Sequence, residues 1–287
     1  MNEQDIKKLK EKYFYFNNNA DEYANIRDNA LEQVLSNKTP SQEPTAYLVM
    51  SQTGGGKSSL KNYILKDILN LVQADSDDCK VFLPYCEEIM LNYPKLYNTL
   101  TRGDAYALEE DMLKSAIEQN YNIVIESTGK VKLWDKLASS RYDIKVYVLA
   151  TSKCNSEFSI LDRYVEQILN TEIKYPKLTE FSRHENSFCN VREFVKEYQN
   201  IPGINISVYA RGKNKFSDLP IIYGKCNSEY SCPYEALLAG QVEDEIKFKQ
   251  HFSLNNELLK KKIEQTKSQI PQTVLEELYE RLNKIAM

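Results

Sequence analysis

The residues best suited to chemistry form one short run in the first quarter of the chain. Residues 51–58 read Ser-Gln-Thr-Gly-Gly-Gly-Lys-Ser, and the consecutive glycines are Gly54, Gly55 and Gly56. Glycines let a backbone turn tightly, so that successive N–H groups can surround an anion. Lys57 would then neutralise the β- and γ-phosphates of a nucleotide, and the Ser58 hydroxyl would ligate Mg²⁺. The run therefore predicts a nucleotide-phosphate-binding loop.

The segments on either side of this loop have the order that such a loop requires. An apolar run at residues 46–50 reads as a strand buried on both faces, and an amphipathic run at residues 60–71 reads as a helix. The loop departs from the usual pattern at Ser51, where glycine is standard. A strand-to-helix turn with chance glycines is the alternative, and the strand and helix context disfavours it.

The remainder of the chain alternates between strand and helix patterns. Further strands are expected at residues 80–83, 122–125, 144–150, 204–210 and 219–223, and helices at 5–36, 104–119, 133–140, 155–169, 184–200 and from 235 onward. Such alternation predicts an α/β fold of the P-loop NTPase type, a mostly parallel sheet covered by helices on both faces. We expect an N-terminal helical extension at 1–44, the main domain at 45–234 and a C-terminal helical appendage at 235–287.

Polar side chains follow two of these strands, at the sheet edge where parallel sheets bind ligands. Glu126, Thr128 and Lys130 come directly after the strand at 122–125. The glutamate can bind a substrate hydroxyl or a metal-bound water, and the other two can hold a phosphate or hydroxyl. A plain polar loop is an equally good interpretation of this piece alone. Glu87, next to another glutamate, can supply a catalytic base, but the residues alone favour a helix start, where the helix dipole stabilises negative charge.

A polar segment at residues 171–182 reads as a loop or lid. Arg163 precedes it, and Lys174, Lys177 and Arg183 lie along it or just after it. Cations on a mobile element suit a lid that closes over a transferring phosphoryl group, although a solvated charged loop is the usual fate of such residues. His184 is expected to be structural rather than a ligand.

Composition excludes several classes of protein. A net charge of −4 argues against a nucleic-acid-binding surface. No apolar run approaches the ~20 residues of a membrane span, and the charged N-terminus lacks the apolar core of a secretory signal. The six cysteines match no zinc pattern, so free thiols in the cytoplasm are expected.

Several segments of the chain together match one family pattern. The entry to the loop reads Pro-Thr-Ala-Tyr-Leu at residues 44–48, and the loop itself follows at 51–58. Residues 120–130 read Asn-Tyr-Asn-Ile-Val-Ile-Glu-Ser-Thr-Gly-Lys, which is the most specific segment, and Lys-Cys-Asn-Ser at 153–156 and Arg-Tyr at 163–164 follow it. In these segments the chain resembles the zeta toxin family, the kinase half of the epsilon/zeta toxin–antitoxin systems, whose relatives phosphorylate UDP-N-acetylglucosamine.

The resemblance, which runs from about residue 44 to about residue 223, implies roles for single residues. ATP phosphates and Mg²⁺ would lie on Lys57 and Ser58. The substrate sugar would contact Glu110, Thr128 and Lys130, the last replacing an arginine of the family.

The resemblance also implies a base and two lid cations. Glu87 would be the catalytic base, by its distance from Pro94, and replaces an aspartate. Arg163 would be the first lid cation and Lys177, in place of arginine, the second, with Arg183 as a neighbouring candidate.

The implied function is an ATP-dependent kinase that phosphorylates the 3′-hydroxyl of UDP-N-acetylglucosamine and so acts as a toxin on cell-wall precursor synthesis. An antitoxin protein is the implied partner. The substitutions by Ser51, Glu87 and Lys130 keep two alternatives open: a kinase of another nucleotide-like metabolite, and a non-catalytic nucleotide-binding module. Replacing aspartate by the longer Glu87 moves the carboxylate by about 1 Å, and lysine in place of arginine loses the planar bidentate fork.

Overall fold

The fold comes from a computed structural model, which describes residues 3–93, 96–170, 176, 178–212, 219–224 and 227–286. The strands are β1 (Thr45–Met50), β2 (Val72–Gln73), β3 (Ile123–Ser127), β4 (Asp143–Ala150), β5 (Ile204–Ala210), β6 (Ile221–Gly224) and β7 (Asn227–Ser228). The α-helices are α1 (Glu3–Tyr13), α2 (Tyr15–Asn18), α3 (Ala20–Leu35), α4 (Lys57–Leu65), α5 (Cys86–Asn92), α6 (Tyr97–Glu118), α7 (Trp134–Ala138), α8 (Lys153–Leu169), α9 (Phe181–Tyr198), α10 (Pro233–Thr266) and α11 (Gln272–Ala286). Two 3₁₀ helices are η1 (Asp78–Phe82) and η3 (Lys267–Gln269).

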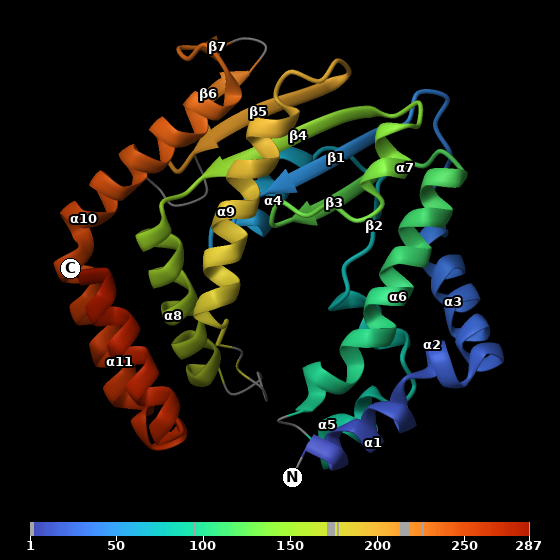
Figure 1. The fold of residues 1–287 in the computed structure, drawn as a ribbon, viewed down its shortest axis with the longest axis horizontal. Coiled ribbons are helices and arrows are strands. Elements are labelled where there is room, and N and C mark those ends of the chain that lie inside the picture. Colours follow the sequence, from blue (N-terminus) through green and yellow to red (C-terminus); the bar gives the residue numbers. More distant parts are fainter. Residues whose placement is uncertain are drawn as a thin grey trace. The chain divides into compact units, whose positions relative to one another are not determined.

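The described strands form one mostly parallel sheet flanked by helices, with the order β2-β3-β1-β4-β5-β6-β7 (Figure 1). β2 pairs with β3 in parallel, with Val72 opposite Ile123, whereas β6 is antiparallel to both β5 and β7. The predicted α/β class is confirmed. β1 has strands on both sides, and its residues 46–50 are all buried, as expected for a continuous apolar run.

The chain divides into two compact units. Unit 1 comprises Met1–Tyr47, Ile68–Ile125 and Val131–Ile144, and unit 2 comprises Leu48–Asp67, Glu126–Lys130 and Lys145–Met287. The three segments expected from sequence, with boundaries after residues 44 and 234, stay a prediction.

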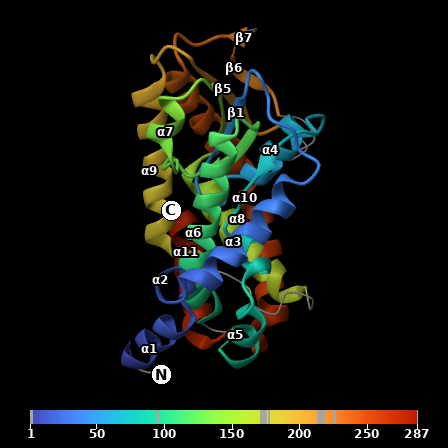
Figure 2. The ribbon, with the colours of Figure 1, turned by 90° about the vertical axis from the view of Figure 1, so that its right-hand side faces the viewer.

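In unit 1, the N-terminal helices pack on α6, and Figure 2 shows α3 alongside it. Asp104 of α6 is fully buried and accepts hydrogen bonds from the backbone N–H groups of Tyr15 and Phe16 and from the Tyr85 hydroxyl. A buried carboxylate must be partnered in this way. These bonds fix the N-terminal segment to the body of unit 1.

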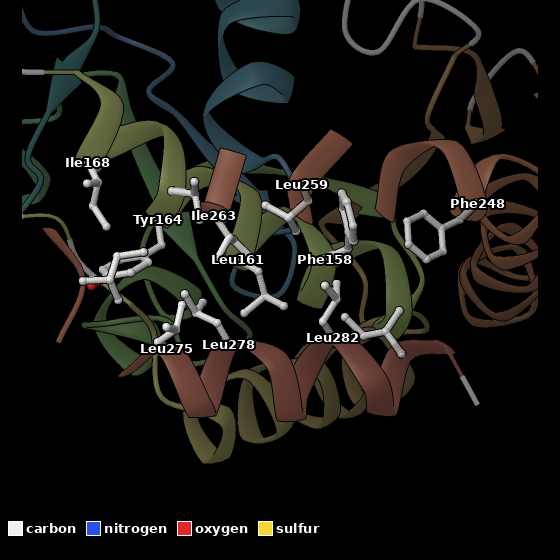
Figure 3. Close-up of a cluster of buried hydrophobic side chains, with 13 residues drawn as sticks. Phe158, Leu161, Tyr164, Ile168, Phe248, Leu259, Ile263, Leu275, Leu278 and Leu282 are labelled. Atoms are coloured by element: carbon white, nitrogen blue, oxygen red, sulfur yellow. The ribbon is translucent and has the colours of Figure 1, made fainter. Parts of the chain in front are cut away.

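In unit 2, the C-terminal helices pack against α8, and Figure 3 shows leucines of α11 pointing toward apolar side chains of α8. The shared apolar cluster consists of Phe158, Leu161, Tyr164, Val165, Ile168, Phe248, Leu259, Ile263, Ile270, Leu275, Leu278, Leu282 and Ile285. Because α10 and α11 supply most of this cluster, they belong to the core of the unit rather than to its surface.

Three sequence-based expectations about the elements are wrong. The strand expected at residues 80–83 is mostly the 3₁₀ helix η1, in which Lys80 is buried and Val81 is 80% exposed, and Leu83, which follows the helix, is buried again. The single helix expected at 5–36 is broken into α1, α2 and α3. The predicted lid at 171–182 extends too far, because α9 already begins at Phe181; its residues 171–175 and 177 lie outside the described residues.

The described cysteines, Cys79, Cys86, Cys154, Cys189 and Cys232, are free thiols. Among the described helices, none has both the length and the apolar character needed to cross a membrane.

Candidate nucleotide-binding site

The glycine-rich loop joins β1 to α4 and has the backbone conformation that glycine allows. Gly54 and Gly56 have φ angles of 76° and 97°, in the left-handed region that other residues rarely adopt. Gly56 caps α4, whose first residue is Lys57. A Cβ atom at Gly54 would lie 2.2 Å from the carbonyl oxygen of Ser156, so the loop packs directly on α8. The loop therefore presents its backbone N–H groups at a helix N-terminus, where an anion is stabilised.

Side chains from neighbouring segments hold this loop in place. Gln52 is fully buried, and its Nε2 donates to the Thr151 carbonyl at 2.7 Å and to Ser156 Oγ at 3.0 Å. The Thr151 hydroxyl in turn donates to the Gly55 carbonyl at 2.8 Å. The backbone N–H of Thr53 donates to Ser187 Oγ at 3.0 Å. A fully partnered polar network of this kind rigidifies the loop.

Ser51 stands where a standard loop has glycine, and the structure shows why serine is tolerated there. Its side chain is fully buried, and its hydroxyl oxygen lies 3.2 Å from the Leu149 carbonyl on β4, to which it donates. The backbone carbonyl of Ser51 accepts from Lys57 Nζ at 3.3 Å. The substitution thus adds a partnered polar group and leaves the loop's turn intact.

Glu126 lies beside the first turn of α4. Its Oε2 accepts from the Ser58 hydroxyl at 3.2 Å, and its Oε1 lies 2.8 Å from Lys61 Nζ. The hydroxyl and the carboxylate are oxygen donors, which Mg²⁺ prefers, and Mg²⁺ at a nucleotide takes only one or two protein ligands besides phosphates and water. The donor set therefore fits magnesium, with Ser58 as the ligand and Glu126 next to it. Within the described residues, no three His, Cys, Asp or Glu side chains converge to hold a metal by themselves.

A cavity of about 570 Å³ opens in front of the loop, entirely within unit 2. Its size is in the range that accommodates a nucleotide. α8 and α10 form its other walls, with Phe158 and Phe248 packed at a ring-centroid separation of 5.5 Å. The full lining is Gly54, Gly56, Lys57, Ser58, Ser59, Asn155, Phe158, Ser159, Asp162, Arg163, Glu166, Arg211, Phe248, Asn255, Leu258 and Lys262.

Three cations line the cavity besides Lys57. Part of the Arg163 side chain is exposed to solvent. The protein around its guanidinium still desolvates the charge enough to lower the pKa of Arg163. Burial likewise lowers the pKa of Arg211, whose Nη1 donates to Asn155 Oδ1 at 2.9 Å and whose Nη2 donates to the Gly55 carbonyl at 3.3 Å. Lys262 forms ion pairs with Glu166 and with Asp162, and its Nζ lies 2.8 Å from Asp162 Oδ1. Arg163 and Arg211 are therefore the cations placed to meet an anion here.

The turn after β3 carries two of the predicted substrate residues. Gly129 has a φ of 97°, and a Cβ atom there would lie 2.3 Å from the backbone of Asn190, so the turn packs closely on α9. Ser127 Oγ accepts from the Gly129 N–H at 3.1 Å. Thr128 is half-buried and Lys130 is exposed. The turn is thus a rigid platform with these two side chains at its surface.

Two predicted site residues lie in unit 1. Glu87 is exposed in the first turn of α5, the helix-opening position that the residues alone favoured. Glu110 is exposed on α6. Its neighbour Glu109 is the half-buried carboxylate, held by Lys132 Nζ at 2.5 Å, and burial raises its pKa.

The structure thus brings part of the predicted site together within unit 2. The loop glycines, Lys57, Ser58, Glu126 and Arg163 lie in one unit around one cavity or in direct contact with its lining. Arg183 is exposed near the start of α9. The predicted second lid cation, Lys177, lies outside the described residues.

Sequence reasoning missed Arg211 and the α10 side of the cavity. Arg211 directly follows β5, so a cation at the end of a predicted strand was the available signal. Phe248, Asn255 and Lys262 had no such signal, because their helix was interpreted as an appendage.

Comparison with known proteins agrees with this architecture. The sequence model of the zeta toxin family matches residues 28–218 of the 287-residue chain. Toxin zeta of Streptococcus pyogenes is 29% identical over 149 residues, covering 50% of this chain and 52% of the relative. Toxin zeta of Enterococcus hirae is 30% identical over 145 residues, covering 48% and 50%. The match therefore spans about half the length of these curated relatives.

Solved structures show the same fold. A chain from the PezAT chromosomal toxin–antitoxin system of Streptococcus pneumoniae matches with a TM-score of 0.66 at 20% identity, covering 84% of this chain and 96% of that one. A chain from the AvrRxo1-ORF1:AvrRxo1-ORF2 structure with sulphate ions matches with a TM-score of 0.51 at 12% identity, covering 75% and 71%. Since the family match extends over well more than half of the sequence, the chain belongs to the zeta toxin family.

Proposed function

We propose that this protein is an ATP-dependent phosphotransferase that acts on a small molecule. The observation that supports it most is the loop between β1 and α4, with left-handed Gly54 and Gly56 and with Lys57 facing a cavity of about 570 Å³. Membership of the zeta toxin family supports the same conclusion.

The residues around the cavity suggest how they would treat a nucleotide. The loop N–H groups and Lys57 would bind its phosphates, and Arg163 and Arg211 would share the charge of the transferring group. Bound Mg²⁺ would supply positive charge that neutralises the phosphates. Ser58 would be its protein ligand, and Glu126 would orient a metal-bound water.

The identity of the phosphoryl acceptor, and the residues that would contact it, are proposed from the resemblance to zeta toxins. The acceptor would be the 3′-hydroxyl of UDP-N-acetylglucosamine, with Glu87 accepting its proton. Glu110, Thr128 and Lys130 would hold the sugar, and Lys177 would add a second lid cation.

The biological role proposed is that of a toxin that diverts a cell-wall precursor in the cytoplasm, with an antitoxin protein as partner. The structural similarity to a chain of the PezAT toxin–antitoxin system supports such a partner.

The test is a product assay. Incubation with ATP, Mg²⁺ and UDP-N-acetylglucosamine should give a phosphorylated sugar nucleotide, identified by its mass and by fragmentation that places the new phosphate on the amino sugar. The Lys57→Ala variant should give none, whereas Lys66→Ala, an exposed lysine at the end of α4, should give as much as the unchanged protein. Turnover of ATP without any phosphorylated sugar nucleotide would reject this acceptor.

One observation favours a second acceptor class, another nucleotide-like metabolite. Lys130 is exposed and lacks the planar fork that an arginine would offer to a diphosphate. A metabolite extract incubated with labelled ATP separates the two, because a labelled product that contains no UDP-sugar would support this alternative.

A further inference from the structure

A buried polar network in unit 2 begins at Arg281 on the C-terminal helix α11. Arg281 and Glu157 of α8 are 3% and 5% exposed, and Arg281 Nε donates to Glu157 Oε1 at 2.6 Å. Arg281 Nη1 also donates to the Thr179 carbonyl at 2.7 Å, just before α9 begins. One guanidinium therefore ties α11 to both α8 and the start of α9.

The network continues through the imidazole of His184. Glu157 Oε2 lies 3.2 Å from His184 Nδ1, and the other ring nitrogen, Nε2, lies 2.8 Å from Ser156 Oγ. The charge of Glu185 raises the pKa of this ring, and the charge of Lys153 lowers it. The approach of Nδ1 to the carboxylate is an electrostatic contact rather than a hydrogen bond, whereas Nε2 and the Ser156 hydroxyl lie within hydrogen-bonding distance.

The last contacts of the network reach the phosphate loop. Ser156 Oγ accepts a hydrogen bond from the side-chain Nε2 of Gln52 at 3.0 Å. The backbone carbonyl of Gln52 accepts from the Gly55 N–H at 2.9 Å. Gln52 and Ser156 are fully buried. A shift of Ser156 would thus move the turn that contains Gly55.

Burial of such a network is hard to explain by stability alone. An apolar set of similar volume often stabilises a core as well as or better than a buried ion pair. What the polar groups add is direction, because charged and hydrogen-bonded contacts follow one another from Arg281 through Glu157, His184 and Ser156 to Gln52.

We propose that Arg281 is a positioning residue: through Glu157, His184 and Ser156 it holds Gln52 and the phosphate loop in their binding conformation. The C-terminal helix α11 then sets the affinity of the loop for nucleotide. The ligand in this inference rests on the proposed function, whereas the ordering of the loop does not.

Two readouts on the full-length protein test the inference. Arg281→Met keeps the aliphatic volume and removes the fork. We expect it to weaken Mg·ATP binding by on the order of 10-fold and to speed amide hydrogen exchange at residues 52–55. Arg281→Lys, which keeps the charge, should restore part of both.

Leu278→Ala is the matched control, because Leu278 lies on the same helix, is fully buried and has no part in the network. It should lower thermal stability at least as much as Arg281→Met, yet leave Mg·ATP affinity within about 2-fold and exchange at residues 52–55 unchanged. Glu157→Gln, an isosteric change at the next contact, should reproduce the Arg281→Met effects and serves if that variant does not fold.

The outcomes separate the inference from the proposed function. Equal effects of the Leu278 and Arg281 variants on the loop, or no effect of the Arg281 variant on either readout, would overturn the inference. If the unchanged protein does not bind Mg·ATP, the proposed function fails, and hydrogen exchange at residues 52–55 alone decides whether Arg281 orders the loop.

Discussion

Glu126 and Ser58 form the contact on which magnesium binding depends in this account. Their oxygen atoms are 3.2 Å apart, and Lys61 Nζ lies 2.8 Å from the other carboxylate oxygen. A lysine beside the carboxylate supplies positive charge there when the nucleotide site is open. We expect this carboxylate to support magnesium binding at the neighbouring Ser58 hydroxyl.

Replacing this carboxylate should therefore change the magnesium requirement. Glu126→Gln keeps the shape and removes the charge, and we expect the Mg²⁺ concentration for half-maximal ATP binding to rise about 10-fold, the usual effect of an outer-shell group. Titration of Mg²⁺ at fixed ATP measures it. Lys61→Met is the control, because it leaves the carboxylate in place and should not raise the requirement. An unchanged magnesium requirement in Glu126→Gln would exclude this role.

At the scale of elements, the loop between β1 and α4 depends on glycine conformation and on close approach to α8. Gly54 needs both, since its φ is 76° and an added Cβ would lie 2.2 Å from the Ser156 carbonyl. Gly203 also has a positive φ, 87°, but an added Cβ there meets nothing within 4 Å. Alanine at Gly203 would therefore suffer backbone strain alone, whereas alanine at Gly54 would suffer both backbone strain and steric overlap.

Gly54→Ala should accordingly do more damage than Gly203→Ala. We expect Gly203→Ala to lower the free energy of unfolding by about 1 kcal/mol, with unchanged ATP binding. Gly54→Ala should lower it by about 2–4 kcal/mol and reduce ATP affinity severely. Urea denaturation and calorimetric titration measure the two quantities. Equal behaviour of the two variants would contradict the packing described for the loop.

The helix α11 makes a second prediction at this scale. Leu282 is almost fully buried in the cluster with α8, whereas Leu254 on α10 is 60% exposed. We expect Leu282→Ala to lower the free energy of unfolding by about 2–5 kcal/mol and Leu254→Ala by less than about 0.5 kcal/mol. Chemical denaturation distinguishes them, and similar small losses would mean that α11 is dispensable for the core.

The elements also show where sequence reasoning succeeds and where it fails. β1 was predictable because its apolar run is continuous, and β4 and β5 were predictable because apolar residues recur through them at strand spacing. The run at 80–83 has the same composition, but Lys80 bonds to Asp77 and Asn98 and the segment turns into η1. The tertiary contacts of Lys80 outweighed apolar composition there.

The candidate site likewise contains residues that the sequence predicts and residues that it does not. The loop glycines and Lys57 were predictable because a contiguous motif contains them. The contributions of Arg211 and α10 depend on which segments far apart in the sequence pack together, and a single sequence carries little of that information.

At the scale of the whole molecule, stability should depend on pH through His184. Burial is the main cause that lowers its pKa from the ordinary value of 6.5, against the opposing effect of Glu157 and Glu185. As pH falls below about 6.5, the unfolded chain binds a proton before the folded one does. The free energy of unfolding should therefore decrease from that pH down to the folded-state pKa, by at most about 1.4 kcal/mol per pH unit for this group.

Urea denaturation between pH 7.5 and 5.5 measures this dependence. Removing the imidazole in His184→Asn should flatten the decrease, whereas His251→Gln, at an exposed position, should leave it unchanged. The same slope in all three proteins would show that His184 does not couple to unfolding.

The most direct test of the central claim is calorimetric titration of Mg·ATP into the full-length protein and its Lys57→Ala variant. The loop geometry predicts saturable one-to-one binding that weakens about 10- to 100-fold when the ammonium group is lost, with Lys66→Ala unchanged. Absence of binding to the unchanged protein, or equal affinity in the Lys57 variant, would contradict the assignment of this loop to nucleotide phosphates.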